Sequence, residues 1–185
     1  MNKYFKLFYK YVMVGGARAQ FILAGLLIIA QIIVIIIDSA GSIVGLRSPF
    51  QGGGNEIVQL QMGLIAAFSL AYTWILGGHV RIELIIDRLG ARGQFFINML
   101  SAFFGMVYCV LVAIGIYEEA MDTQMLMIRT DMLRIQIAPV MFLFSLSFAH
   151  FALLLFFEFI RNCLGLIRGT DSMNYMSALQ VTHLD

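Results

Sequence analysis

The chain has 185 residues, of which 61% are hydrophobic and 12% charged, and its mean hydropathy is +0.88. A soluble domain is about half apolar and about a quarter charged, so this composition excludes an ordinary soluble protein and indicates one built for lipid. The net charge of +1 decides little, because in a membrane protein the placement of charge matters more than its sum. No basic, aromatic-interleaved face is present, so we expect no nucleic-acid partner.

Four apolar segments are long enough to cross a bilayer, which takes about 20 helical residues. They are residues 20–37, 57–77, 94–117 and 135–160. The first follows several lysines, as a signal peptide would, but its apolar core exceeds the roughly 7–15 residues of such a signal. Asp38 also spoils the small-residue cleavage pattern, so we interpret this segment as a membrane span.

The fold predicted from these segments is an all-α integral membrane protein, a bundle of four transmembrane helices. A single domain over residues 1–168 contains the bundle, and residues 169–185 form a short cytoplasmic tail. The distribution of lysine and arginine sets the orientation. One side collects Lys3, Lys6, Lys10, Arg18, Arg81, Arg88, Arg92, Arg161 and Arg168, and the other holds Arg47, Arg129 and Arg134. This bias predicts that both termini are cytoplasmic.

A charged segment, residues 77–92, lies between the second and third spans. Its apolar residues recur at helical spacing and would form one stripe, which consists of Ile82, Ile85, Ile86 and Leu89. The segment therefore predicts an interfacial amphipathic helix that lies along the membrane surface. Its polar residues are candidates for an interface with lipid or with another subunit: His79, Arg81, Glu83, Asp87, Arg88 and Arg92.

Small residues recur every four positions in two spans. The third span has Ser101, Gly105, Cys109 and Ala113, and the second has Gly63, Ala67 and Ala71. Such spacing lets helix backbones approach closely. It favours packing within the bundle over a surface for another subunit, although both readings stay open.

Few ionisable groups lie at membrane depth, where they are costly to bury. We expect His150 to hydrogen-bond with Ser145, Ser147 or a neighbouring helix, and Glu158 to pair with Arg161 one turn away. No span carries a row of carboxylates, so a proton or sodium pathway inside this chain alone is not expected.

The alternatives from other classes are a haem-binding or structural membrane anchor subunit of a respiratory oxidoreductase, and a membrane enzyme. A haem-binding anchor needs two histidines at one depth, but His79 and His150 are offset by on the order of 15 Å at 1.5 Å per residue. A membrane enzyme would need a Ser or Cys nucleophile matched to a base at similar depth, and the sequence offers none. We therefore expect no cofactor and no catalytic activity.

Acidic and basic residues alternate between the third and fourth spans. They are Glu118, Glu119, Asp122, Arg129, Asp131 and Arg134. A solvated loop and a docking surface for a soluble partner explain them about equally well.

The segment from His79 to Arg92 resembles the DctQ-like small membrane subunit of TRAP (tripartite ATP-independent periplasmic) transporters. That family places a segment like GHVRVDLLxxRL at the cytoplasmic end of its second span. Here it reads Gly78, His79, Val80, Arg81, Ile82, Glu83 and Leu84, then Arg88 and Leu89. Glu83 replaces the more usual aspartate. A second match is LRIQIAP, residues 133–139, where the family has a proline that opens the fourth span.

The resemblance implies a small permease subunit that does not itself move substrate. Its partners would be a large multi-span transport subunit, a periplasmic substrate-binding protein and membrane lipid. The complex would import organic acids with sodium across the bacterial inner membrane. The small subunit would act as a scaffold for the large one, and the charged residues 118–134 would face the periplasm.

Overall fold

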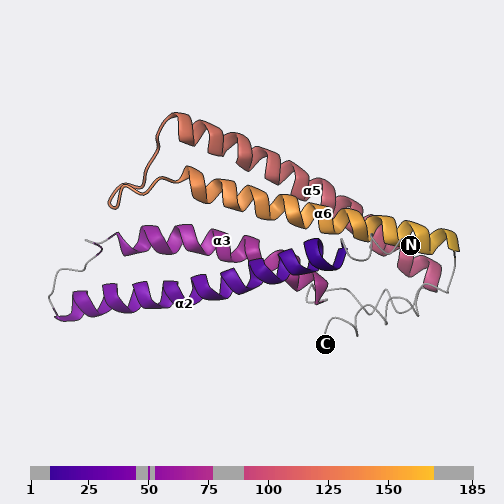
Figure 1. The fold of residues 1–185 in the computed structure, drawn as a ribbon, viewed down its shortest axis with the longest axis horizontal. Coiled ribbons are helices and arrows are strands. Elements are labelled where there is room, and N and C mark those ends of the chain that lie inside the picture. The colour runs from indigo at the N-terminus through magenta and orange to yellow at the C-terminus, as the bar shows by residue number, and fades with distance from the viewer. Residues whose placement is uncertain (1–8, 45–49, 51–52, 77–89, 169–185) are drawn as a thin grey trace. The chain divides into compact units, whose positions relative to one another are not determined.

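The computed structural model describes residues 9–44, 50, 53–76 and 90–168, and the regular elements within these ranges are helices (Figure 1). A π-helical turn, η1 (Tyr9–Val14), leads into α2 (Gly15–Val44), which is followed by α3 (Gly54–Ile75). The two later helices are α5 (Ala91–Met125) and α6 (Ala138–Arg168). Four of these helices are long and apolar enough to cross a membrane, as the sequence predicts.

The helix bounds differ from the predicted spans in an informative way. Residues 20–37 lie inside α2, and residues 94–117 lie inside α5. Beyond Tyr117, α5 continues because Glu, Ala, Met and Gln in residues 118–125 favour helix. The fourth helix begins at Ala138 rather than at residue 135, and Pro139 lies in its first turn, where a missing N–H is tolerated.

The chain divides into two compact units, which we describe separately. The first comprises described residues of 1–79 and 109–151, and the second comprises those of 80–108 and 152–185. The helices α5 and α6 therefore each contribute to both units. The expected cytoplasmic tail, residues 169–185, and most of the expected interfacial helix, residues 77–89, lie outside the described residues.

In the first unit, α2 packs against α3, which runs antiparallel to it (Figure 1). Ala24 of α2 is buried with Leu64 and Phe68 of α3, and Val140 and Phe144 of α6 pack against this cluster. The small-residue stripe of α3 lies in the same contact. Ala67 and Ala71 are buried, and a Cβ on Gly63 would lie 3.4 Å from the Phe144 ring. The prediction that this stripe packs within the chain is confirmed.

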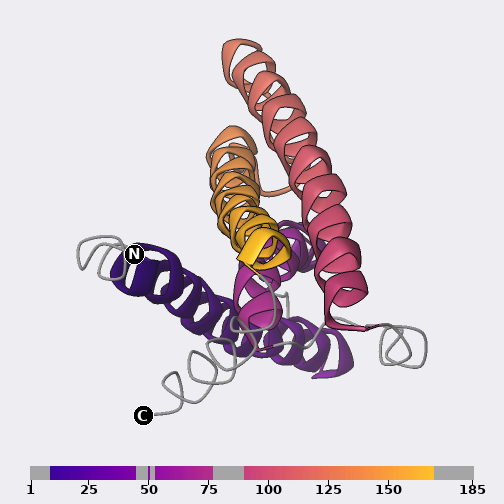
Figure 2. The same ribbon diagram turned by 90° about the vertical axis from the view of Figure 1, so that its right-hand side faces the viewer.

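The helices α5 and α6 form an antiparallel hairpin that Figures 1 and 2 both show side by side. In the first unit, Cys109 and Ala113 of α5 are buried. In the second unit, a Cβ on Gly105 would lie 3.2 Å from Leu155, and the Phe103 and Phe159 rings are 5.8 Å apart. Ser101 is exposed, so the α5 stripe packs at three of its four predicted positions.

Candidate functional site

The predicted lipid or subunit interface falls largely outside the part of the chain that the structure describes. His79, Arg81, Glu83, Asp87 and Arg88 all lie in residues 77–89. Arg92 belongs to the first turn of α5, but its side chain is likewise not described. The role of this segment stays a prediction.

The acidic residues of the predicted docking surface lie on a helix rather than in a loop. Glu118, Glu119 and Asp122 occupy the last turns of α5, and all three are exposed. The helix continues beyond Tyr117, the predicted end of the third span, because nothing between Tyr117 and Met125 breaks a helix. It ends at Met125, two residues before Met127, where φ is 51°.

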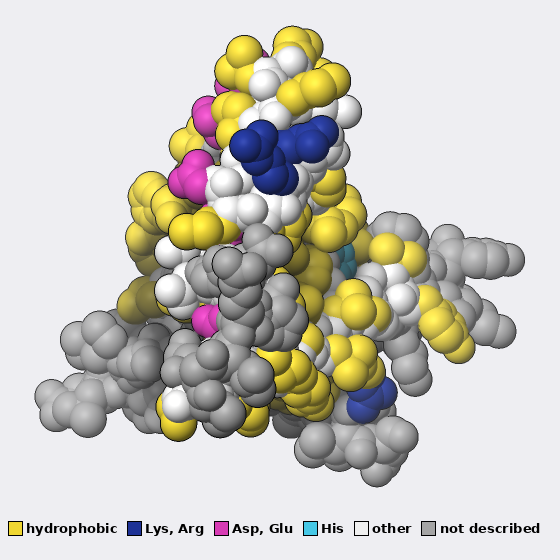
Figure 3. All heavy atoms as spheres, turned by 90° about the vertical axis from the view of Figure 1, so that its left-hand side faces the viewer, with side chains coloured by type: hydrophobic (Ala, Val, Ile, Leu, Met, Phe, Trp, Pro, Cys, Tyr) yellow, Lys and Arg dark blue, Asp and Glu magenta, His cyan; other side chains and the backbone are white. Residues whose placement is uncertain are grey.

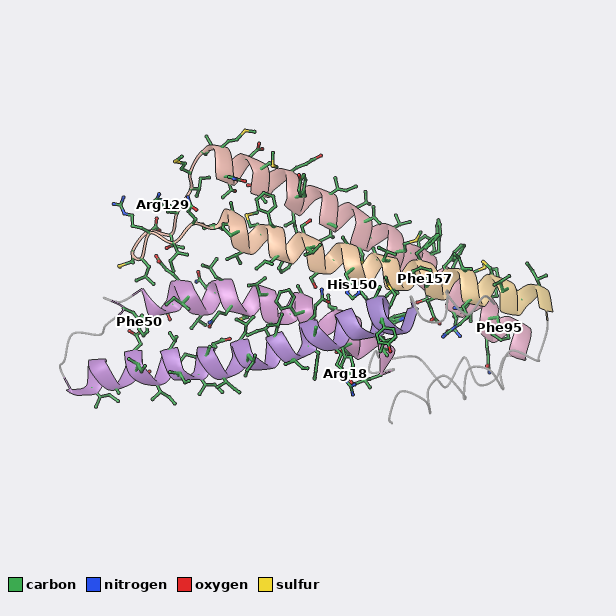
Figure 4. The ribbon with its side chains drawn as sticks, in the orientation of Figure 1. Arg18, Phe50, Phe95, Arg129, His150 and Phe157 are labelled. Atoms are coloured by element: carbon green, nitrogen blue, oxygen red, sulfur yellow. The ribbon has the colours of Figure 1, made fainter. Side chains whose placement is uncertain are left out.

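The other three charged residues of the same surface lie in the loop that joins α5 to α6. Arg129, Asp131 and Arg134 are exposed, and Figure 4 shows Arg129 at the end of the hairpin. Arg129 pairs with Gln136 through an isolated antiparallel bridge. Figure 3 shows basic and acidic side chains beside one another on this end, with hydrophobic side chains around them.

The loop is held by hydrogen bonds that orient its backbone. The Thr130 hydroxyl accepts from the backbone N–H of Ile135 at 3.0 Å, and the Thr130 N–H donates to the Ile135 carbonyl at 2.9 Å. Arg134 has φ 56°, a left-handed conformation that turns the chain back toward α6. The six predicted charges are therefore presented by an ordered helix end and an ordered turn.

Glu56, in the first turn of α3, binds the backbone of this loop and holds the loop against the N-terminus of α3. Its carboxylate accepts hydrogen bonds from the backbone N–H groups of Met132 at 2.8 Å and Leu133 at 3.0 Å. A carboxylate that accepts two N–H groups makes a strong, charge-assisted contact. We call these two hydrogen bonds the Glu56 latch. The sequence analysis missed this residue, because a contact between residues 76 positions apart has no local signal.

Glycine is needed at two positions near Glu56, because side chains from other elements approach the backbone closely there. A Cβ on Gly53 would lie 2.6 Å from Leu133 of the loop, and one on Gly54 would lie 2.9 Å from the Asp38 carboxylate of α2. Gly54 is the first residue of α3. The small size of both glycines lets the N-terminus of α3 sit against both α2 and the loop.

The polar residues at membrane depth bind other helices of the first unit. The Ser145 hydroxyl donates to the Ala113 carbonyl of α5 at 2.7 Å, and the Ser147 hydroxyl donates to the Ala67 carbonyl of α3 at 2.8 Å. His150 points from α6 toward α2, where its Nδ1 lies 3.1 Å from Gln20 Oε1 (Figure 4). The expected contact of His150 with a neighbouring helix is confirmed, and its partner is Gln20 rather than either serine.

The second unit contains the predicted ion pair on α6. Arg161 Nη2 donates to the Glu158 carboxylate, which also accepts from Asn162 Nδ2 at 3.3 Å. Asn162 is fully buried, and its Nδ2 donates to the Glu158 carbonyl at 2.9 Å. The pair is therefore part of a local network on one helix.

Among the described residues, the side chains do not form a site that supports metal or haem binding. No group of three or more His, Cys, Asp or Glu side chains gathers there in a way that could hold a metal ion. His150 is the one histidine among the described residues, and its Nδ1 faces Gln20 rather than a second histidine.

Four long apolar helices, tied together by hydrogen bonds between them, define a multi-pass membrane protein. Its family follows from comparison with family models. Residues 31–165 match the family described as "Tripartite ATP-independent periplasmic transporters, DctQ component", and the chain belongs to this family. It is a family of transporter components and not of enzymes. No curated protein and no solved structure matches the chain.

Proposed function

We propose that this chain is the small permease subunit of a sodium-dependent transporter that imports organic acids across the bacterial inner membrane. The family match over residues 31–165 carries this proposal. In it, the chain is the scaffold for a large multi-span transport subunit, and both of its termini are cytoplasmic. A separate substrate-binding protein delivers the organic acid from the periplasm.

The polar contacts of the first unit support a scaffold role. Ser145, Ser147 and His150 each bind a group on a different helix, so α6 is tied to α5, α3 and α2. Transporters that coordinate ions use broken helices and free polar groups near the middle of the membrane. Here the three polar side chains of α6 hold helices of this chain together, as a scaffold subunit requires.

The exposed apolar side chains of the bundle support contact with lipid and with a large membrane partner. On α2, for example, Ile22, Ile29 and Ile36 are each more than half exposed within the chain. An isolated bundle in lipid gains no hydrophobic energy from covering such side chains, so association with a partner relies on packing. The charged residues 118–134 form the periplasmic docking surface in this proposal.

Reconstitution in liposomes tests the proposal directly. The purified chain alone should show no uptake of an organic acid under an inward sodium gradient. The chain together with its large subunit and the substrate-binding protein should show uptake that stops when the gradient is removed. Robust uptake by the purified chain alone would contradict the scaffold role, and uptake without this chain would show that the subunit is dispensable.

A further inference from the structure

The tip of the α5–α6 hairpin has four large apolar side chains that are each well over half exposed. Met125, Leu126, Met127 and Met132 are 73%, 72%, 68% and 65% exposed. We call these four residues the methionine knob. Exposed methionines form adaptable apolar surfaces, because the side chain is flexible and its sulfur is polarisable. Figure 3 shows hydrophobic side chains on this end, next to the charged ones.

The length of α5 indicates that its last turns extend beyond the hydrocarbon core of the membrane. Residues 93–117 of α5 carry no charge and reach about 37 Å at 1.5 Å per residue, enough for a hydrocarbon core of about 30 Å. Residues 118–125 add about 12 Å of helix, whereas the headgroup layer on one side is about 5–8 Å thick. With residues 93–117 in the hydrocarbon core, the helix end at Met125 therefore reaches past the headgroup layer, where exposed apolar groups mark interaction sites.

The knob is ordered before any partner binds. The Glu56 latch holds the backbone of Met132 itself, and the hydrogen bonds between Thr130 and Ile135 close the turn next to it. Leu133 packs against Gly53 at the start of α3. A surface that is already fixed loses less conformational entropy on binding, so its contacts contribute more to affinity.

The charges beside the knob favour a protein over a lipid surface. Glu118, Glu119 and Asp122 precede it on α5, and Arg129 and Arg134 accompany it in the loop. A membrane with anionic lipids attracts basic segments and repels an acidic flank. A folded partner can instead match an acidic patch and a basic patch at once, which sets its orientation.

We propose that the methionine knob is the anchor on which the soluble substrate-binding component docks, and that Glu56 is the positioning residue that holds it. This inference rests on the proposed function, since it names the contact through which that component meets this subunit. The apolar anchor and the charged docking surface lie beside one another at the same end of the α5–α6 hairpin. Apolar anchors combined with polar contacts are typical of protein interfaces.

A pair of triple variants tests the anchor. One replaces Met125, Met127 and Met132 with Gln, which removes the apolar character at similar length, and the other replaces them with Leu, which keeps it. Each is assembled with the large subunit in nanodiscs, and binding of the substrate-binding component is measured by biolayer interferometry. We expect the Gln variant to bind about tenfold more weakly, because it loses the apolar anchor, and the Leu variant to bind like wild type.

Co-purification of the large subunit separates the two proposals. If it co-purifies with both variants and both bind the soluble component like wild type, the anchor is wrong and the proposed function stands. If wild type itself fails to co-purify with a large subunit or to bind a soluble component, both proposals fail. A photo-crosslinking residue in place of Met127 should capture the soluble component; capture of lipid or of a second copy of this chain would overturn the anchor.

Glu56→Gln tests the positioning role. An amide oxygen can replace only part of the carboxylate's two hydrogen bonds, so the backbone N–H groups of Met132 and Leu133 should exchange with solvent faster. Glu158→Gln is the matched control, because it makes the same chemical change on a carboxylate that hydrogen-bonds within α6, outside the loop and the docking surface. Glu56→Gln should also weaken docking without changing co-purification of the large subunit. Unchanged exchange together with unchanged docking would show that Glu56 does not position the knob.

Discussion

His150 and Gln20 join α6 to α2 through a side-chain contact of 3.1 Å between Nδ1 and Oε1. Beside this contact, a Cβ on Gly16 would lie 3.0 Å from the imidazole Nε2. The ring therefore lies in a notch made by a glycine and is fixed by an amide. A polar bridge of this kind defines which faces of two apolar helices meet, since apolar packing alone specifies them weakly.

The coupling between His150 and Gln20 can be measured by a double-mutant cycle. Gln20→Leu, His150→Leu and the double variant each remove one or both partners. Hydrogen bonds between membrane helices contribute about 0.6 kcal/mol on average and about 1.7 kcal/mol at most, so the coupling energy should fall in that range. The measurement is the free energy of unfolding in mixed micelles. A coupling of zero would mean that the contact does not stabilise the bundle.

Two glycines of α2 offer a matched comparison. Gly16→Ala places a methyl group against the imidazole, whereas a Cβ on Gly25 would meet nothing within 4 Å. Overpacking costs about 1–3 kcal/mol, and alanine in an open helical position is favourable by up to about 1 kcal/mol. Gly16→Ala should therefore lower the thermal midpoint, and Gly25→Ala should leave it unchanged or raise it. Equal effects of the two changes would show that the notch is not tightly packed.

Much of the bundle could be predicted from local patterns, and the reasons are physical. Apolar runs, the position of Pro139 and the spacing of Gly63, Ala67 and Ala71 all depend on residues near one another in sequence. The partner of His150 could be predicted only as a group on some neighbouring helix. Gln20 is 130 positions away, so its selection depends on tertiary packing.

The predicted docking surface, residues 118–134, shows which structural features local sequence patterns do not predict. Glu118 was expected in a loop because charge ends an apolar run, but charge does not end a helix once the helix leaves the membrane. The Glu56 latch could not be expected at all, because its acceptor is a side chain and its donors are backbone groups in a distant turn. The close contacts that a Cβ on Gly53 or Gly54 would make with Leu133 and Asp38 likewise depend on the fold.

The orientation of the chain can be tested by cysteine labelling. After Cys109 and Cys163 are replaced with Ala, a single cysteine is placed at Asn55, Asp122 or Asp87. Asn55 and Asp122 are exposed in the structure, and the positive-inside rule assigns both to the periplasmic side. An impermeant maleimide added to intact spheroplasts should label positions 55 and 122 and spare position 87. Labelling of position 87 alone would reverse the predicted topology.

Arg81 lies outside the described residues, and the family motif makes it the sharpest sequence-based prediction. A headgroup contact needs mainly positive charge, whereas a two-pronged contact with a partner carboxylate needs the planar guanidinium. Arg81→Lys should leave membrane insertion intact in either case, and it should weaken co-purification of the large subunit only if Arg81 binds that subunit. If Arg81→Lys and Arg81→Ala both assemble and transport like wild type, the residue serves topology alone.

Oxidation gives an independent test of the methionine knob. Hydrogen peroxide converts a thioether to a sulfoxide and is itself reduced to water, which makes an exposed apolar side chain polar. Nanodiscs that contain this chain and the large subunit would be treated with peroxide, cleared with catalase and then tested for docking of the untreated soluble component. Docking should weaken and should recover after treatment with methionine sulfoxide reductases. The variant with Leu at positions 125, 127 and 132 controls for oxidation elsewhere, since it keeps the other methionines. If peroxide weakens docking of that variant as much as that of wild type, the sensitive methionines lie outside the knob.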